Sequence, residues 1–189
     1  MNMLYYAMKL KIIGLAVIVS TVNYPAMVHS QESEEFQPPS ELNRLEYFEG
    51  TWRCQQPAKP ETPVGVFTWT VQKDLNDFWY IGNAEETQSP NNGNLINSQE
   101  FLGYNAASKK LVRSVVVGNG NSFNLFASDW QDGKLVWEGT VIDKGQLIPL
   151  RQEIIQDSQD QFSATYFISD DGAEWKPVVN ETCDRIRAN

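Results

Sequence analysis

Histidine and cysteine are scarce in this sequence, which has one histidine and two cysteines in 189 residues. The single histidine, His29, lies in a segment that we expect to be removed, so the mature chain would have none. Without histidine a protein cannot build Ser-His or Cys-His nucleophilic machinery, and it loses the commonest metal ligand and the usual haem ligand. The composition therefore predicts no catalytic residue of these kinds, no metal site and no cofactor.

Sequence motifs of common catalytic and binding sites are also missing. There is no Gly-x-Ser-x-Gly elbow, no phosphate-binding loop and no acidic spacing of the EF-hand type. Gly118-Asn119-Gly120 reads as a turn, and no repeat of solenoid length is present. A known enzyme class is therefore not indicated by any motif.

Basic residues are outnumbered by acidic ones, 15 against 24. Residues 1–30 contain Lys9 and Lys11 and no acidic residue, so the formal charge changes from −9 to −11 if this segment is removed. Such a charge repels nucleic-acid phosphates and anionic membranes, and no basic stripe offsets it. We expect no nucleic-acid partner.

Long apolar runs are absent as well. The longest, Ile12–Val19, is shorter than the roughly 20 residues that a membrane-spanning helix needs. It follows a basic stretch and precedes polar residues with small side chains near Ser30, which is the pattern of a signal peptide over residues 1–30. The sequence thus predicts a secreted or periplasmic protein with no integral membrane segment after cleavage, rather than an anchored one.

The remainder divides into a leader and one domain. Residues 31–39 are acidic, end in two prolines and are expected to be disordered, and residues 40–189 suit a single domain. Ser40 can cap a short helix over residues 41–48, in which Leu42, Leu45 and Phe48 recur at every third position. The sequence says nothing about oligomeric state.

Beyond Gly50 the sequence alternates between short β-branched or aromatic runs and turn residues. About ten such runs follow one another at the spacing typical of a β-sandwich or barrel. The Asp132-Gly133 pair and the segment 170–175 are hairpin signals. Pro149 and Pro177 indicate strand edges or bulges.

The two cysteines fit one strand register. Trp52 and Cys54 share a face of the first predicted strand, and Cys183 and Arg185 share a face of the last. If these strands pair antiparallel with Trp52 opposite Arg185, then Cys54 lies opposite Cys183, at a Cα distance of roughly 4.5–5.5 Å. We therefore predict a disulfide that closes a barrel, in preference to two buried thiols.

The same residues carry a resemblance. Gly50-Thr51-Trp52 after a short helix resembles the opening of calycins, the lipocalin-like barrels, and Arg185 matches the arginine that packs over the tryptophan in that superfamily. The order of LEYFEGTW, FLGYNAASKKLV and a terminal Cys-x-Arg is similar to a bacterial single-domain family of unknown function, although Asn105 stands where that family carries aspartate. The resemblance implies an all-β fold, an antiparallel calycin-like barrel of about 8–10 strands with a short N-terminal helix.

Seven side chains in the predicted strands are candidates for a ligand site inside this barrel. A small barrel can hold one ligand, and binding pockets are mostly apolar and aromatic. The candidates are Trp69, Trp79, Tyr80, Arg113, Phe123, Trp137 and Tyr166. The alternative is that the aromatic residues form an ordinary core. We expect Arg113 to point outward; pointing inward, its guanidinium would bind a ligand carboxylate.

Three glutamates are weaker candidates. Glu85 and Glu86 end one predicted strand, and Glu138 lies within another. Paired carboxylates can perform acid–base chemistry if their pKa values are split, but we expect these three to be solvated on the outer face.

The function favoured by these observations is an exported, non-catalytic β-barrel that binds a small apolar or amphipathic ligand. One alternative is an isomerase or hydrolase that uses a carboxylate base in the barrel cavity. Another is a structural or partner-binding envelope protein with a filled barrel. A cavity would argue against the filled barrel, and a buried carboxylate of raised pKa facing it would favour the enzyme.

Overall fold

The computed structural model describes residues 37–58, 63–89 and 94–187. The predicted signal peptide and most of the predicted leader lie outside these residues. Within the described part of the chain, no helix is both long and apolar enough to cross a membrane.

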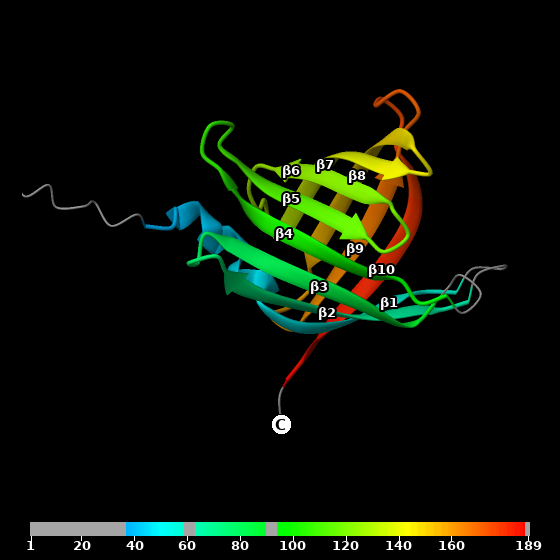
Figure 1. The fold of residues 1–189 in the computed structure, drawn as a ribbon, viewed down its shortest axis with the longest axis horizontal. Coiled ribbons are helices and arrows are strands. Elements are labelled where there is room, and N and C mark those ends of the chain that lie inside the picture. The colour runs from blue at the N-terminus through cyan, green and yellow to red at the C-terminus, as the bar shows by residue number, and fades with distance from the viewer. Residues whose placement is uncertain (1–36, 59–62, 90–93, 188–189) are drawn as a thin grey trace, which may run out of the picture. The chain divides into compact units, whose positions relative to one another are not determined.

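One short helix, η1 (Ser40–Phe48), precedes ten strands (Figure 1). The strands are β1 (Gly50–Gln56), β2 (Gly65–Asp74), β3 (Trp79–Gln88), β4 (Asn97–Asn105), β5 (Lys110–Val117), β6 (Ser122–Ala127), β7 (Lys134–Asp143), β8 (Gln146–Gln156), β9 (Gln161–Ile168) and β10 (Lys176–Ile186). Each strand pairs antiparallel with its neighbours, and β1 pairs with β10, which closes the sheet into a barrel. The predicted fold class, an all-β antiparallel barrel with a short N-terminal helix, is confirmed.

The predicted register between the first and last strands is also correct. Trp52 lies opposite Arg185, and Cys54 lies opposite Cys183. The two cysteines form a disulfide whose Cα atoms are 4.0 Å apart and which joins positions separated by 129 residues. Both sheet hydrogen bonds and a covalent bond therefore hold the barrel closed.

The turn and proline predictions agree with the backbone. Asp132 and Gly133 have φ angles of 50° and 75°, as a tight hairpin turn requires. Pro177 lies at an irregularity in the β9–β10 register. The pairing of β8 with β9 begins only at Leu150, so Pro149 lies where β8 pairs with β7 alone.

Helix η1 is a 3-10 helix whose first residue is Ser40. The predicted Ser40 cap is wrong, because Pro39 occupies the cap position and its carbonyl oxygen accepts the backbone N–H of Leu42 at 3.0 Å. That short-range backbone bond leaves no need for a side-chain acceptor. The buried spacing of Leu42, Leu45 and Phe48 matches the three residues per turn of such a helix.

Helix η1 closes one end of the barrel. The Phe48 ring packs against Trp69 and Phe162, with centroid distances of 5.6 and 5.9 Å. The Tyr47 hydroxyl donates to a backbone carbonyl of the β8–β9 turn, that of Ser158, at 2.9 Å. The indole N–H of Trp130, in the β6–β7 connection, donates to the backbone carbonyl of Arg44 in η1. The aromatic rings fill the barrel interior next to the helix, and the hydrogen bonds attach the helix to the turns at this end.

Candidate ligand-binding cavity

The other half of the barrel interior is hollow. A cavity of about 470 Å³ is lined by inward-facing side chains of all ten strands. It extends from the disulfide and Phe162 to Asn121 and Asp143, which lie beside the β5–β6 and β7–β8 turns at the end opposite η1. Because side chains leave this volume open, the filled-barrel alternative is disfavoured.

Four of the seven candidate residues line the cavity. They are Trp69, Arg113, Phe123 and Tyr166. They come from β2, β5, β6 and β9, and the closed sheet brings them to one interior surface. Their role in binding a ligand stays a prediction.

The remaining three candidates do not line the cavity. Trp79 lies on the outer face of β3, where its ring covers Gly103 so closely that a Cβ atom there would lie 2.6 Å from it. Tyr80 and Trp137 point inward and are fully buried, but they belong to the core toward η1. Strand alternation placed Trp79 and Tyr80 on opposite faces, so both could not have faced one interior site.

Arg113 points into the barrel, so the expected outward orientation is wrong. Its side chain is 12% exposed and forms an ion pair with Glu100 of β4. A second guanidinium nitrogen donates to the Gln152 side-chain oxygen at 2.5 Å, and the guanidinium lies 5.6 Å from the Trp69 ring centroid. Burial lowers the pKa of Arg113, but the charges of Glu100, Tyr166 and Glu181 and the hydrogen bond to Glu100 together raise it above the ordinary value.

The Glu100 side chain packs over Gly82, where the absence of a Cβ atom leaves room for it. A Cβ atom at position 82 would lie 2.5 Å from the Glu100 Cγ and 2.8 Å from the Trp69 Nε1. Only glycine leaves room there for the carboxylate and the indole together. Glu100 was not among the residues predicted from the sequence. The available signal was Gly82, because a glycine inside a strand often marks a position that other atoms approach closely.

Glu181 is the second buried carboxylate that faces the cavity, and it is 6% exposed. Tyr166 donates its hydroxyl to Glu181 at 3.2 Å. Burial raises the pKa of Glu181 to about 7, against the opposing effects of Arg113 and of hydrogen bonds from Tyr166 and Gln56. Burial and the Glu181 charge raise the pKa of Tyr166 well above 10, so its hydroxyl stays protonated.

Glu181 was also missed from the sequence, although a signal existed. The predicted disulfide directs Cys183 into the barrel, and residues two apart on a strand share a face. Glu181 therefore had to face inward with Cys183. Glu100, Arg113, Gln152, Tyr166 and Glu181 are called the polar cluster below.

The three glutamates that the sequence offered as candidates behave differently from one another. Glu85 is exposed, and Glu138 is exposed and pairs with Arg151 at 2.5 Å, as expected for outer-face positions. Glu86 instead is half-buried at the mouth of the cavity, where its carboxylate accepts the Ile96 backbone N–H at 2.9 Å. Within the described residues, no cluster of three or more His, Cys, Asp or Glu side chains could hold a metal ion.

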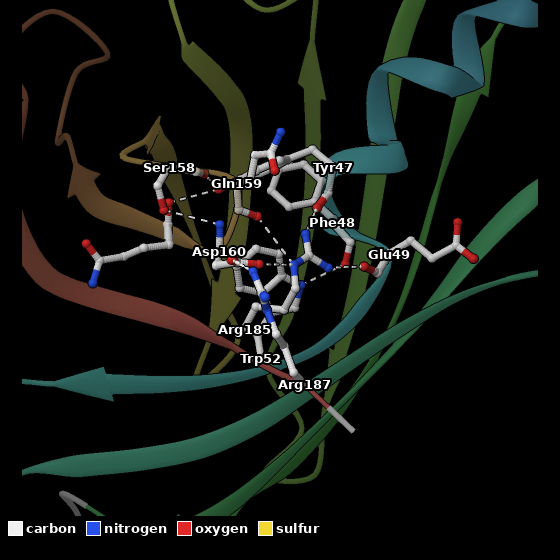
Figure 2. A network of polar contacts seen from close by, with 10 residues as sticks. Tyr47, Phe48, Glu49, Trp52, Ser158, Gln159, Asp160, Arg185 and Arg187 are labelled. Carbon is white, nitrogen blue, oxygen red and sulfur yellow. Dashed lines mark hydrogen bonds and ion pairs between the residues drawn. The ribbon is translucent and has the colours of Figure 1, made fainter. Parts of the chain in front are cut away.

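Trp52 and Arg185 form a separate structural site at the closed end of the barrel (Figure 2). The Trp52 ring is fully buried, its Nε1 donates to the Phe48 carbonyl at 2.8 Å, and the Arg185 guanidinium carbon lies 4.0 Å from its centroid. Arg185 also donates to the backbone carbonyls of Tyr47 and Glu49. This arrangement connects η1 to β1 and β10, with the Arg185 guanidinium packed over the indole.

Comparison with known proteins supports the fold. No protein-family model and no curated protein matches the chain. The crystal structure of Rv2717c from M. tuberculosis is similar, with a TM-score of 0.58 and 10% identity over 80% of this chain and 100% of that one. A redesigned β-barrel, b11L5F_LGL, has a TM-score of 0.42 and 12% identity over 75% of this chain and 94% of that one. At this identity the likeness to the mycobacterial protein shows a shared barrel fold.

Proposed function

We propose that this protein is an exported β-barrel that binds one small, largely apolar ligand in its interior cavity and does not transform it. The observation that carries the proposal is the cavity of about 470 Å³, which falls within the range of roughly 300–1,000 Å³ typical of small-molecule sites. Its walls are mainly aliphatic and aromatic, and the small polar cluster crosses it from β4 and β5 to β8, β9 and β10. This combination is common where an apolar ligand is oriented by a few polar contacts.

The closed end of the barrel supports the same proposal. Helix η1 closes one end and the disulfide fixes the β1–β10 seam, so a ligand would enter past Asn121 and Asp143 at the other end. A disulfide is kept in oxidising compartments, which agrees with export to the periplasm or the exterior. We also propose that the chain is a calycin-like barrel, on the strength of the Trp52–Arg185 pair.

Native mass spectrometry of protein purified from its own host tests the proposal. We expect the native mass to exceed the denatured mass by the mass of one small molecule. Protein that carries no such molecule, and that also takes up no apolar dye, would contradict the proposal.

A cavity-filling variant locates the binding. Ala84 lines the cavity, whereas its neighbour Glu85 is exposed on the outer face of the same strand. Ala84→Trp should abolish uptake of the neutral dye N-phenyl-1-naphthylamine, and Glu85→Trp should leave it unchanged. Equal uptake by both variants would place the dye outside the barrel.

A second function, acid–base catalysis, is favoured by one observation. Glu181 is a buried carboxylate that faces the cavity and has a pKa of about 7, close to the value suited to a general base. If it acts on a bound molecule, Glu181→Gln protein should retain a ligand of different chemical structure from the wild type, namely the substrate. The same ligand in both proteins would favour the carrier over the enzyme.

A further inference from the structure

We propose that the ligand carries a protonated amine on its apolar body and that the Glu181 carboxylate receives this amine inside the cavity. The inference rests on the proposed ligand-binding function and specifies the chemistry of the ligand.

Arg113 is the only cationic side chain among the cavity-lining residues that the structure describes, and it is already engaged. Its Nε donates to the Glu100 carboxylate, and its Nη1 donates to Gln152. A ligand carboxylate would have to displace these partners and leave Glu100 buried without a counter-charge, which is costly. The inward arginine therefore neutralises a protein carboxylate and does not act as an anion receptor.

The polar cluster contains two carboxylates and one guanidinium, so its charges do not balance when both carboxylates are ionised. Arg113 forms an ion pair with Glu100, and its charge also acts at longer range on the buried Glu181 carboxylate. When both carboxylates are ionised, the cluster has one negative charge in excess. A cation from the ligand would balance it at the surface of the cavity.

The entrance to the cavity is also negatively charged. Glu86 and Asp143 line the mouth, and within the described residues neither has a lysine or arginine within ion-pair distance. Their oxygens accept hydrogen bonds from neutral groups, the Ile96 backbone N–H and the Asn121 amide. Acidic groups at the mouth of a cleft attract cations and repel anions.

Protonation of Glu181 is coupled to binding of a cation. Burial favours the neutral acid, whereas Arg113 and the hydrogen bonds from Tyr166 and Gln56 favour the anion, and Glu100 opposes it. A ligand ammonium group would add to the groups that favour the anion. Near neutral pH, binding should therefore release part of a proton from Glu181.

Isothermal titration calorimetry with three probes of equal chain length tests the inference on the oxidised protein. Decylamine, decanol and decanoate each have ten carbons and carry a positive, a neutral and a negative head group at pH 7. We expect decylamine to bind at least about tenfold more tightly than decanoate. In buffers of different ionisation enthalpy, decylamine should release protons at pH 7 and decanol should not.

Matched variants assign the effect to one carboxylate. Glu181→Gln should reduce the preference for decylamine over decanoate by about tenfold and abolish proton release. Glu85→Gln removes the same charge from the outer face of the barrel and should change neither. An unaltered preference in Glu181→Gln would overturn the assignment to this residue.

The outcomes separate the inference from the function on which it rests. If decanol or decanoate binds as well as decylamine, the ligand-binding function stands and the inferred amine is wrong. If none of the three probes binds and N-phenyl-1-naphthylamine is not taken up either, both proposals are wrong; uptake of the dye without binding of any probe would overturn the amine alone.

Discussion

Trp52 lies at the centre of the contacts between η1, β1 and β10. Its ring contacts Phe162 at a centroid distance of 4.9 Å and is covered by Arg185, and its indole nitrogen is hydrogen-bonded. Gly50 begins the strand with a φ of 119°, and a Cβ atom there would lie 2.8 Å from an Arg185 guanidinium nitrogen. The Gly-x-Trp triplet is therefore explained by the space that Arg185 needs to cover the indole.

Replacement of this tryptophan should destabilise the fold strongly. We expect Trp52→Ala to lower the free energy of unfolding by about 3–5 kcal/mol, because it removes a fully buried aromatic side chain. Trp175→Ala is the control, since Trp175 lies in the β9–β10 loop with the Arg151 guanidinium 4.4 Å from its ring centroid. Denaturant unfolding of both variants measures the difference, and equal losses would contradict a special role for Trp52.

Glu181 should make stability depend on pH in an unusual direction. Its pKa is about 7 in the folded protein against an ordinary value of 4.5, so between these values the folded state binds more protons than the unfolded state. Its contribution to stability is present below pH 4.5 and is lost as the pH rises through 7. The loss amounts to about 3 kcal/mol by linkage.

Unfolding by guanidinium chloride at pH 5 and pH 8 measures this effect. The wild type should lose more stability between the two pH values than Glu181→Gln, which cannot ionise there. Parallel losses in the two proteins would show that Glu181 ionises normally.

Strands β1 and β10 are far apart in the sequence and are joined by the disulfide. Their register places Cys54 opposite Cys183 without any shift, so the bond adds a covalent link to an existing strand pair. The disulfide stabilises mainly by restricting the unfolded chain.

Removal of the disulfide should be costly because the closed loop is long. We expect the double variant Cys54→Ser, Cys183→Ser to lose about 4–5 kcal/mol of unfolding free energy in the chain-entropy model. Reductant should produce a similar loss in the wild type and none in the variant. Thiol titration of the denatured, unreduced wild type should find no free thiol, and a full complement would refute the bond.

The barrel consists almost entirely of pairs between consecutive strands, and only the β1–β10 pair connects distant segments. Closure of that pair requires the ends of the chain to meet, which carries the largest loss of chain entropy. When the disulfide stays intact in the unfolded chain, it keeps β1 and β10 linked, so most of this entropy loss does not recur on refolding.

Refolding kinetics test whether closure limits folding. Unfolded protein with an intact disulfide should refold about tenfold faster, or more, than the double serine variant in stopped-flow measurements. Equal refolding rates, with faster unfolding of the variant, would place closure after the rate-limiting step.

Most of the barrel could be predicted from the sequence because its determinants are local or lie in single strands. Alternation of apolar residues predicted the strands, and Asp-Gly pairs predicted turns. One strand register satisfied both Trp52–Arg185 and Cys54–Cys183. The spacing of Leu42, Leu45 and Phe48 also marked the helix that closes the barrel. Each of these features follows from residues within a few positions or from a single strand pair.

The cavity and its polar cluster were decided by the tertiary structure. Arg113 turns inward because Glu100 and Gln152, on other strands, supply its partners, and no pattern around Arg113 contains them. The open volume is likewise the space left after side chains of ten strands have packed. The sequence alone therefore determined a closed, disulfide-linked barrel, and the three-dimensional packing alone decided which charged groups face its interior, because burial and pairing depend on residues far apart in the chain.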